Sequence, residues 1–321
     1  MRLFFLLLIS LLFIGGLQAQ AAAGTTAKDT SWTFASSFGL DLSGLGIINP
    51  KIGAGTSRFG LGGLGTVSAN RKTDKAFWNN QFSLQLATQR QGRSSLTQPD
   101  GFQKNLDVLR LTSTYGRKIS GDKLYVSVDL LAQSQLLKTY KSNYLKPVPA
   151  SVDSDYVVSK FLSPALIQLS PGVTYKTNAH LSFQYSPVAV RFIYVSDQAI
   201  ADQYIHGNEQ GKNTFLGLGS ELVGRYENKY FKDHFAVNST LRLFSNYLDR
   251  PGSIDVLFVN NFSIQIFKGL SLDLLGEIFY DEDVKMNLDE NDNGIYGDPG
   301  DRQAPATQLT GAFMLKYSKI F

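Results

Sequence analysis

The chain has 321 residues, of which 43% are apolar and 18% are charged, with a net charge of +4 and no cysteine. Disulfides are therefore excluded in any compartment, and so is a lipid anchor attached through cysteine. Lysine and arginine are spread along the chain rather than clustered, which argues against a nucleic-acid-binding surface. The length suits one large domain or two small ones.

The first twenty residues have the layout of an export signal. Arg2 supplies a positive charge, and an apolar core over 3–14 follows it before two glycines and a run of small residues. We therefore predict that 1–20 is removed and that 21–321 forms a single domain. The apolar core is too short to span a bilayer, and no later segment reaches the roughly 18 apolar residues that a membrane helix needs.

From about residue 31 onward, the chain is predicted to form about twelve strands and no long helix. Apolar and polar side chains alternate with a period of two, as in a strand that has one apolar and one wet face. In 270–280 the even positions are mostly apolar, whereas the odd positions include Asp273 and Glu277. The same pattern is found at 78–88, 126–132, 161–175, 214–226, 235–245 and 254–266. A soluble β-sandwich alternates too, so this pattern alone leaves both classes open.

The gaps between these segments alternate between short and long. Short gaps are predicted at 71–75, 117–122, 176–179, 227–232 and 267–269. Long gaps are predicted at 44–57, 91–103, 137–157, 197–212 and 282–305, and only 247–253 is shorter than expected. Short turns at one end and long loops at the other are typical of outer-membrane barrels. We therefore predict an all-β, antiparallel, up-and-down transmembrane barrel of about twelve strands, porin-like, in the outer membrane of a Gram-negative bacterium.

Two local features refine this prediction. The last segment presents alternate apolar side chains outward and resembles the C-terminal assembly signal of bacterial outer-membrane proteins, carried by Tyr317 and Phe321. The barrel assembly machinery is therefore an expected partner during biogenesis, and membrane lipid an expected environment. In 181–195 the apolar residues change from odd to even positions at Ser186–Pro187. Because proline has no backbone N–H to donate to a neighbouring strand, we predict a bulge there. The alternative is two short strands.

Charged side chains occupy the inward parity of several predicted strands. Such a set most often forms salt bridges that hold a barrel wall together, and it can also line a polar pathway whose charge sets selectivity. The pattern leaves both interpretations open. The residues are Arg110, Asp129, Arg191, Glu221, Arg225, Arg242, Asp273, Glu277 and Lys316.

The acidic loop at 281–301 contains half of a calcium-binding pattern. Asp289, Asn291 and Asn293 supply alternating oxygen ligands, and a glycine follows, as in the first half of a D-x-[DN]-x-[DN]-G loop. The glutamate expected later is absent, with Asp298 nearby. Weak calcium binding is one interpretation, and a solvated acidic loop is the other.

Enzymatic and nucleotide-binding motifs are weak. The glycines at 60–65 formally fit G-x-G-x-x-G, but no βαβ unit surrounds them, so no nucleotide is expected. No G-x-S-x-G sequence accompanies the three histidines, His180, His206 and His234. We therefore expect no catalytic residues, no enzyme and no cofactor apart from the weak calcium site, with a membrane esterase kept as a minor alternative.

Five segments, 62–71, 159–176, 186–202, 241–256 and 278–285, resemble an uncharacterised family of outer-membrane barrels from Bacteroidetes-type bacteria, defined as a domain of unknown function. The resemblance implies a barrel and its location, and it supplies no activity. The leading functional hypothesis is a passive channel or transporter for an unidentified small solute. The alternative is a plugged structural or interaction barrel that acts through its outer loops on an unidentified protein partner.

Overall fold

The computed structural model describes residues 32–45, 58–91, 101–140, 144–145, 156–284, 286–288, 290 and 302–320. Three sequence predictions lie outside these residues. They are the export signal at 1–20, the calcium ligands Asp289, Asn291, Asn293 and Asp298, and the terminal Phe321 of the assembly signal.

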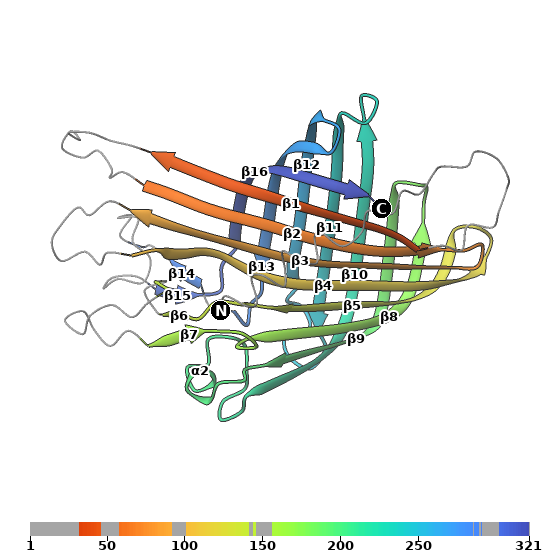
Figure 1. The fold of residues 1–321 in the computed structure, drawn as a ribbon. Coiled ribbons are helices and arrows are strands. Elements are labelled where there is room, and N and C mark those ends of the chain that lie inside the picture. The colour runs from red at the N-terminus through yellow and green to blue at the C-terminus, as the bar shows by residue number, and fades with distance from the viewer. Residues whose placement is uncertain are drawn as a thin grey trace.

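Twelve antiparallel strands close into one barrel, in the order β1-β16-β13-β12-β11-β10-β9-β8-β5-β4-β3-β2 (Figure 1). The predicted fold and strand number are therefore confirmed. The strands are β1 (Trp32–Leu45), β2 (Arg58–Lys72), β3 (Ala76–Gln91), β4 (Gln103–Ser120), β5 (Leu124–Ser134), β8 (Ala165–Lys176), β9 (Leu181–Tyr194), β10 (Thr214–Tyr230), β11 (Phe235–Asn246), β12 (Asp255–Phe267), β13 (Leu270–Tyr280) and β16 (Gln308–Ile320).

The connections differ between the two ends of the barrel, as predicted. Tight turns join the strands at one end, which we call the short-turn end, and longer connections join them at the long-loop end. Small elements that the sequence did not indicate lie at the long-loop end (Figure 1): β6 (Thr139–Tyr140) pairs with β7 (Val157–Ser159), β14 (Met286–Leu288) pairs with β15 (Arg302–Ala304), and α2 (Gln198–Ala201) follows β9. No helix in the described part of the chain is long and apolar enough to cross a bilayer.

The predicted segment 161–175 needs one correction, because β8 begins only at Ala165. Lys160 and Ser163 exchange backbone hydrogen bonds in a tight turn, and Leu162 within it has a φ of 59°. The backbone groups of this turn are therefore used locally and are not available to the neighbouring strand.

The predicted bulge lies in β9, which continues through Pro187 as one strand. Its register shifts against both neighbours, because β9 holds an extra residue between the pairs Ser186–Glu221 and Ala189–Gly219. Gly172 of β8 permits the close approach there: a Cβ on this residue would lie 2.1 Å from the carbonyl oxygen of Tyr185 in β9. The prediction of a bulge rather than two short strands is confirmed.

The seam that closes the barrel is the least complete ladder. β1 and β16 pair only from Ala35–Ile320 to Leu40–Leu315, near the short-turn end. β1 continues beside β2 as far as Leu45, and β16 pairs with β13 from Gln308 onward. Over this second part, toward the long-loop end, β1 and β16 have no ladder between them.

Candidate functional site in the barrel lumen

The structure places all nine predicted inward residues on the inner face of the wall, where they form four separate groups. Each strand contributes alternate side chains to the lumen, which explains why residues distant in sequence meet there. The residues so placed are Arg110, Asp129, Arg191, Glu221, Arg225, Arg242, Asp273, Glu277 and Lys316.

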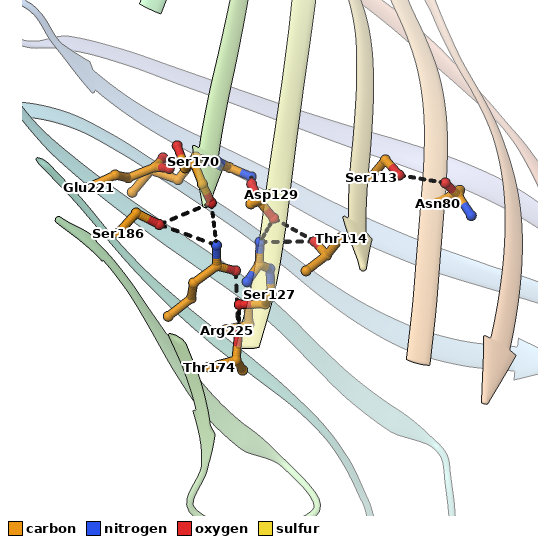
Figure 2. A network of polar contacts seen from close by, with 12 residues as sticks. Asn80, Ser113, Thr114, Ser127, Asp129, Ser170, Thr174, Ser186, Glu221 and Arg225 are labelled. Carbon is orange, nitrogen blue, oxygen red and sulfur yellow. Dashed lines mark hydrogen bonds and ion pairs between the residues drawn. The ribbon is translucent and has the colours of Figure 1, made fainter. Parts of the chain in front are cut away.

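The largest group is centred on Asp129 of β5, which is only 1% exposed. Its carboxylate accepts hydrogen bonds from Thr114 (2.5 Å) and Arg242 (2.5 Å) and pairs with Arg225, as Figure 2 shows in part. Arg242 also donates to Glu221 at 2.9 Å. Two cations and two carboxylates therefore neutralise one another, as a buried group of charges requires.

A layer of uncharged polar side chains fills the lumen beside this group (Figure 2). The Ser127 and Thr174 hydroxyls lie 2.7 Å apart, and Gln184 and Ser186 donate to the backbone carbonyl of Ser170 at 3.0 and 3.1 Å. All five residues are buried. These side chains and the Asp129 group pack the part of the wall formed by β5, β8, β9, β10 and β11, which we call the network half.

A second group bridges the lumen. Arg110 of β4 donates to Glu277 of β13 at 3.0 Å, although four strands separate β4 from β13 along the shorter way around the barrel. Gln133 of β5 accepts a hydrogen bond from Arg110 Nε at 2.9 Å and so fixes the guanidinium. The two charged side chains remain 10% and 20% exposed, respectively. The Arg110–Glu277 pair therefore forms a constriction that solvent reaches.

The third group lies nearer the long-loop end and is centred on Arg191 of β9. Its guanidinium pairs with Asp255 at the start of β12 and with Asp281 (3.2 Å) just after β13. Gln168 accepts from Arg191 Nε at 2.9 Å, and the guanidinium stacks 3.9 Å from the Phe244 ring centroid. Asp255 and Asp281 were not among the predicted site residues: Asp255 lies on the inward parity of the predicted strand 254–266 but was not selected, and Asp281 lies beyond the predicted strand 270–280.

The fourth group is local to neighbouring strands. Asp273 of β13 is fully buried, pairs with Lys316 of β16, and accepts from Ser263 and Ser271, both at 2.6 Å, and from Asn261 at 3.0 Å. This group ties β12, β13 and β16 together without crossing the lumen. The wall formed by β12, β13, β16, β1, β2 and β3 is called the seam half below.

The lumen is open to solvent from the short-turn end. Asn79 and Gln81 of β3 and Asn238 of β11 lie on the inward parity of their strands and are nevertheless exposed. Gln81 pairs laterally with Thr112, two residues along β4 from Arg110. A polar vestibule therefore extends from the short-turn end toward the Arg110–Glu277 constriction.

At the long-loop end, two connections pack together above the network half. Val195, Ile200 and Ala201 form a small buried core, and His206 Nε2 lies 2.6 Å from the carbonyl oxygen of Val158. Burial lowers the pKa of His206. Asp197 caps α2, and its hydrogen bond from Lys160 at 2.5 Å lowers the pKa of its carboxyl.

Among the residues that the structure describes, no three His, Cys, Asp or Glu side chains are grouped to hold a metal ion. His180 Nδ1 and His234 Nδ1 lie near the backbone carbonyls of Glu227 and Phe231, at 3.0 and 2.9 Å. With His206 beside Val158, each of the three histidines is engaged with main chain rather than with a serine side chain.

Residues 51–140, which include β2 to β5, match a family described as Protein of unknown function (DUF3078). The match confirms the resemblance to a domain of unknown function and carries no information on the bacterial group. No curated protein matches the chain in sequence.

Several solved barrels are similar in shape. An outer-membrane channel from Pseudomonas putida F1 is 11% identical, with 94% of this chain and 100% of that chain covered and a TM-score of 0.40. The translocator domain of the autotransporter NalP from Neisseria meningitidis is 10% identical (89% and 86% covered, TM-score 0.37). The toluene transporter TodX from P. putida is 11% identical (92% and 91% covered, TM-score 0.32). Likeness at this level carries no functional argument.

Proposed function

We propose that this protein is a bacterial outer-membrane barrel that passes small polar solutes passively through its lumen, past the Arg110–Glu277 pair. The single observation that carries the proposal is the exposure of inward-facing Asn79, Gln81 and Asn238 below that pair. A barrel whose only task was to hold its wall together would not need a solvated vestibule leading to a partly exposed ion pair.

The outer wall supports the membrane location. Outward side chains such as Phe38 (54% exposed), Ile264 (53%) and Leu315 (49%) leave large apolar areas uncovered, which soluble proteins rarely do. The strands close into a barrel whose ladders are incomplete mainly along the long-loop part of the β1–β16 seam, so such a wall suits hydrocarbon.

Aromatic side chains mark the border of this apolar wall near the short-turn end. The ring centroids of Trp32 and Trp78 lie 5.4 Å apart, those of Trp78 and Tyr115 lie 6.3 Å apart, and the indole of Trp78 donates to Ser113 at 2.9 Å. Rings with a polar group of this kind are enriched where hydrocarbon meets water. Tyr317, 56% exposed, faces outward at the same end, and we propose that it contributes to recognition by the barrel assembly machinery.

The test is ion selectivity in planar bilayers. Arg110→Gln removes the cation and leaves Glu277 facing the vestibule, so conductance should rise and become more cation-selective. Glu277→Gln leaves Arg110 and should shift the reversal potential in the opposite direction. Glu209→Gln is the matched control, because Glu209 pairs with Lys212 in an outer connection, away from the lumen. Opposite shifts from the two lumen variants, with none from the control, support the channel.

A plugged structural or interaction barrel is the second candidate. It is favoured by the packed Asp129 group and by the connections that cover the network half. A folded, heat-modifiable barrel that conducts neither as the wild type nor as either variant would reject the channel. Cross-linking through the long loops would then be the way to find the partner.

A further inference from the structure

The incomplete ladder between β1 and β16 leaves two strand edges facing each other. Residues 41–45 of β1 pair with β2 on one side only, and residues 308–314 of β16 pair with β13 on one side only. If the register continued, Leu42 would face Phe313, two positions beyond the last pair, Leu40–Leu315. In Figure 1, β16 lies beside β1 only toward its arrowhead. The barrel therefore closes near the short-turn end and parts toward the long-loop end.

The exposure of the β16 side chains agrees with a parted seam. Leu309 is 74% exposed and Phe313 is 64% exposed, compared with 49% for Leu315 within the paired part. Both face outward from the strand, at the level where a neighbouring strand would normally shield one flank. Ile278 of β13, which pairs with Leu309, is only 37% exposed because it has a strand on both sides.

The parted edges lie beside an apolar belt, where unpaired backbone groups are costly. An edge strand presents N–H and C=O groups toward the gap, and hydrocarbon offers them no hydrogen bonds. A molecule with a polar head and an apolar chain suits this place. Its head can hydrogen-bond to the unpaired backbone N–H and C=O groups, and its chain can contact the apolar outer surface.

The lumen beside the gap is lined differently from the network half. Gly39 of β1 is buried against Met314, and Leu64 of β2 and Met314 of β16 are 6% and 5% exposed. Ala312 and Leu275 continue this uncharged surface on β16 and β13. On the β16 side, an apolar chain therefore meets the small and apolar side chains of Ala312 and Met314, with the charged Glu277 only beside Thr310, farther toward the long-loop end.

The outward-facing positions near the unpaired part of β16 also carry unusually small side chains. Gly276 of β13 and Gly311 of β16 are lateral partners on the outward parity, and neither has a side chain to cover the wall. Asn260 of β12 pairs laterally with Gly276 and accepts from Ser239 at 2.6 Å. A shallow row of small and polar positions therefore leads along the membrane face to the unpaired part of β16.

We infer that β1 and β16 form a lateral portal in the long-loop half of the barrel, through which single-chain amphiphiles pass between lumen and membrane. The inference rests on the proposed channel, because it supplies a second exit from the same lumen. Its substrate class is a molecule with one apolar chain and a hydrogen-bonding head.

The first experiment compares disulfide formation in two introduced cysteine pairs. Because the chain has no natural cysteine, only the introduced pair can be oxidised to a disulfide. Leu40→Cys with Leu315→Cys joins the last paired position and should oxidise rapidly in the membrane-embedded barrel. Leu42→Cys with Phe313→Cys lies across the parted edges and should oxidise much more slowly. Equal rates would show that the ladder continues and would overturn the portal.

The second experiment asks whether acyl chains reach the inner side of the gap. Trp32→Phe and Trp78→Phe remove both natural tryptophans. A single tryptophan is then placed by Ala312→Trp beside the gap, or by Asn238→Trp on β11, three strands away, as the control on a fully paired part of the wall. The lateral pairs Ala312–Leu275, Leu275–Asn261 and Asn261–Asn238 connect the two inward positions across β13 and β12. The full mature chain is reconstituted in phosphatidylcholine vesicles with brominated or unbrominated acyl chains.

Brominated chains should quench the tryptophan at position 312 several-fold more than that at 238, while aqueous acrylamide quenches both. Equal, weak quenching by brominated lipid at both positions would overturn the portal. Shielding of position 312 from both quenchers would overturn it too, because another segment or a second copy would then occupy the seam. Failure here leaves the selectivity shifts of the Arg110 and Glu277 variants unaffected, so the portal and the channel are tested separately.

Discussion

The network half and the seam half of the barrel are built from the same alternating strands, and yet they are filled in opposite ways. In the network half, Asp129, Glu221 and Arg242 are buried in a neutral cluster. In the seam half, Asp273 and Lys316 form one local pair, Glu277 reaches across the lumen to Arg110, and small or apolar side chains such as Ala312 and Met314 line the wall beside the gap. The difference indicates a division of roles, in which one half provides rigidity and the other provides the path.

The largest expected effect concerns the two buried aspartates. Asp129→Asn leaves Glu221 as the only carboxylate to balance the buried Arg242 and the partly buried Arg225, and it should cost about 3–5 kcal/mol of unfolding free energy. Asp273→Asn leaves only Lys316 unbalanced and keeps three neutral donors, so we expect about 1.5–3 kcal/mol. Urea unfolding of the barrel in vesicles measures both values. Asp122→Asn, in an exposed turn, is the control and should change nothing measurable. A larger loss of unfolding free energy for Asp273→Asn than for Asp129→Asn would contradict the assignment of the main stabilising charge cluster to the network half.

The second effect concerns glycines on the two halves. Gly219→Ala places a Cβ 1.9 Å from the Ser245 carbonyl oxygen and should destabilise the barrel by about 1–3 kcal/mol. Gly65→Ala on β2 meets nothing within 4 Å and should stabilise slightly, by about 0.5–1 kcal/mol, because alanine loses less backbone entropy in a strand. The same unfolding assay decides the signs. Similar losses at both positions would show that the seam half is packed as tightly as the network half.

A third effect is pH-dependent and is confined to the connections over the network half. Burial lowers the pKa of His206 below its ordinary 6.5, so the folded contact favours the neutral ring. Its stability is therefore fully present above that ordinary value and declines as the pH falls toward the folded pKa. The protection factors for hydrogen exchange at 156–163 and 197–213, which correct for the intrinsic pH dependence of exchange, should fall as the pH is lowered from about 7 to about 5. His206→Gln should abolish this dependence, whereas His180→Gln, at the opposite end, should retain it.

The smallest effect is expected at the mouth above β12 and β13. Arg250, with its side chain 50% exposed, pairs with Glu282 at 2.5 Å and with Asp283 at 2.8 Å. Because exposed pairs are screened by water, Arg250→Gln should cost less than about 1 kcal/mol and even less at high salt. Unfolding at two salt concentrations checks this. A large, salt-independent loss would mean that these loops hold the seam half together.

Alternation and loop length predicted the barrel, because both follow directly from strand geometry and from an apolar outer wall. Pro187 predicted the bulge in β9 through its missing donor. The partners of the inward charges could not be predicted, since parity places Arg110 and Glu277 on the inner face without saying which strands face each other. The pairing of Asp255 and Asp281 with Arg191 was not predicted for a related reason, because inward parity at Asp255 does not identify its partner and Asp281 lies beyond the alternating segment. The parted seam could not be predicted, because apolar and polar residues alternate in the sequence without recording where the ladder between two strands ends.

The Arg110–Glu277 bond joins residues 167 positions apart, from a strand synthesised early and a strand synthesised late. It requires β4 and β13 to face each other across a lumen that already exists, so it contributes nothing while the sheet is still open. Interactions that form after the rate-limiting step slow unfolding and leave the folding rate unchanged. The ion pair that narrows the lumen should therefore also slow unfolding of the finished barrel, while leaving the rate of folding and insertion unchanged.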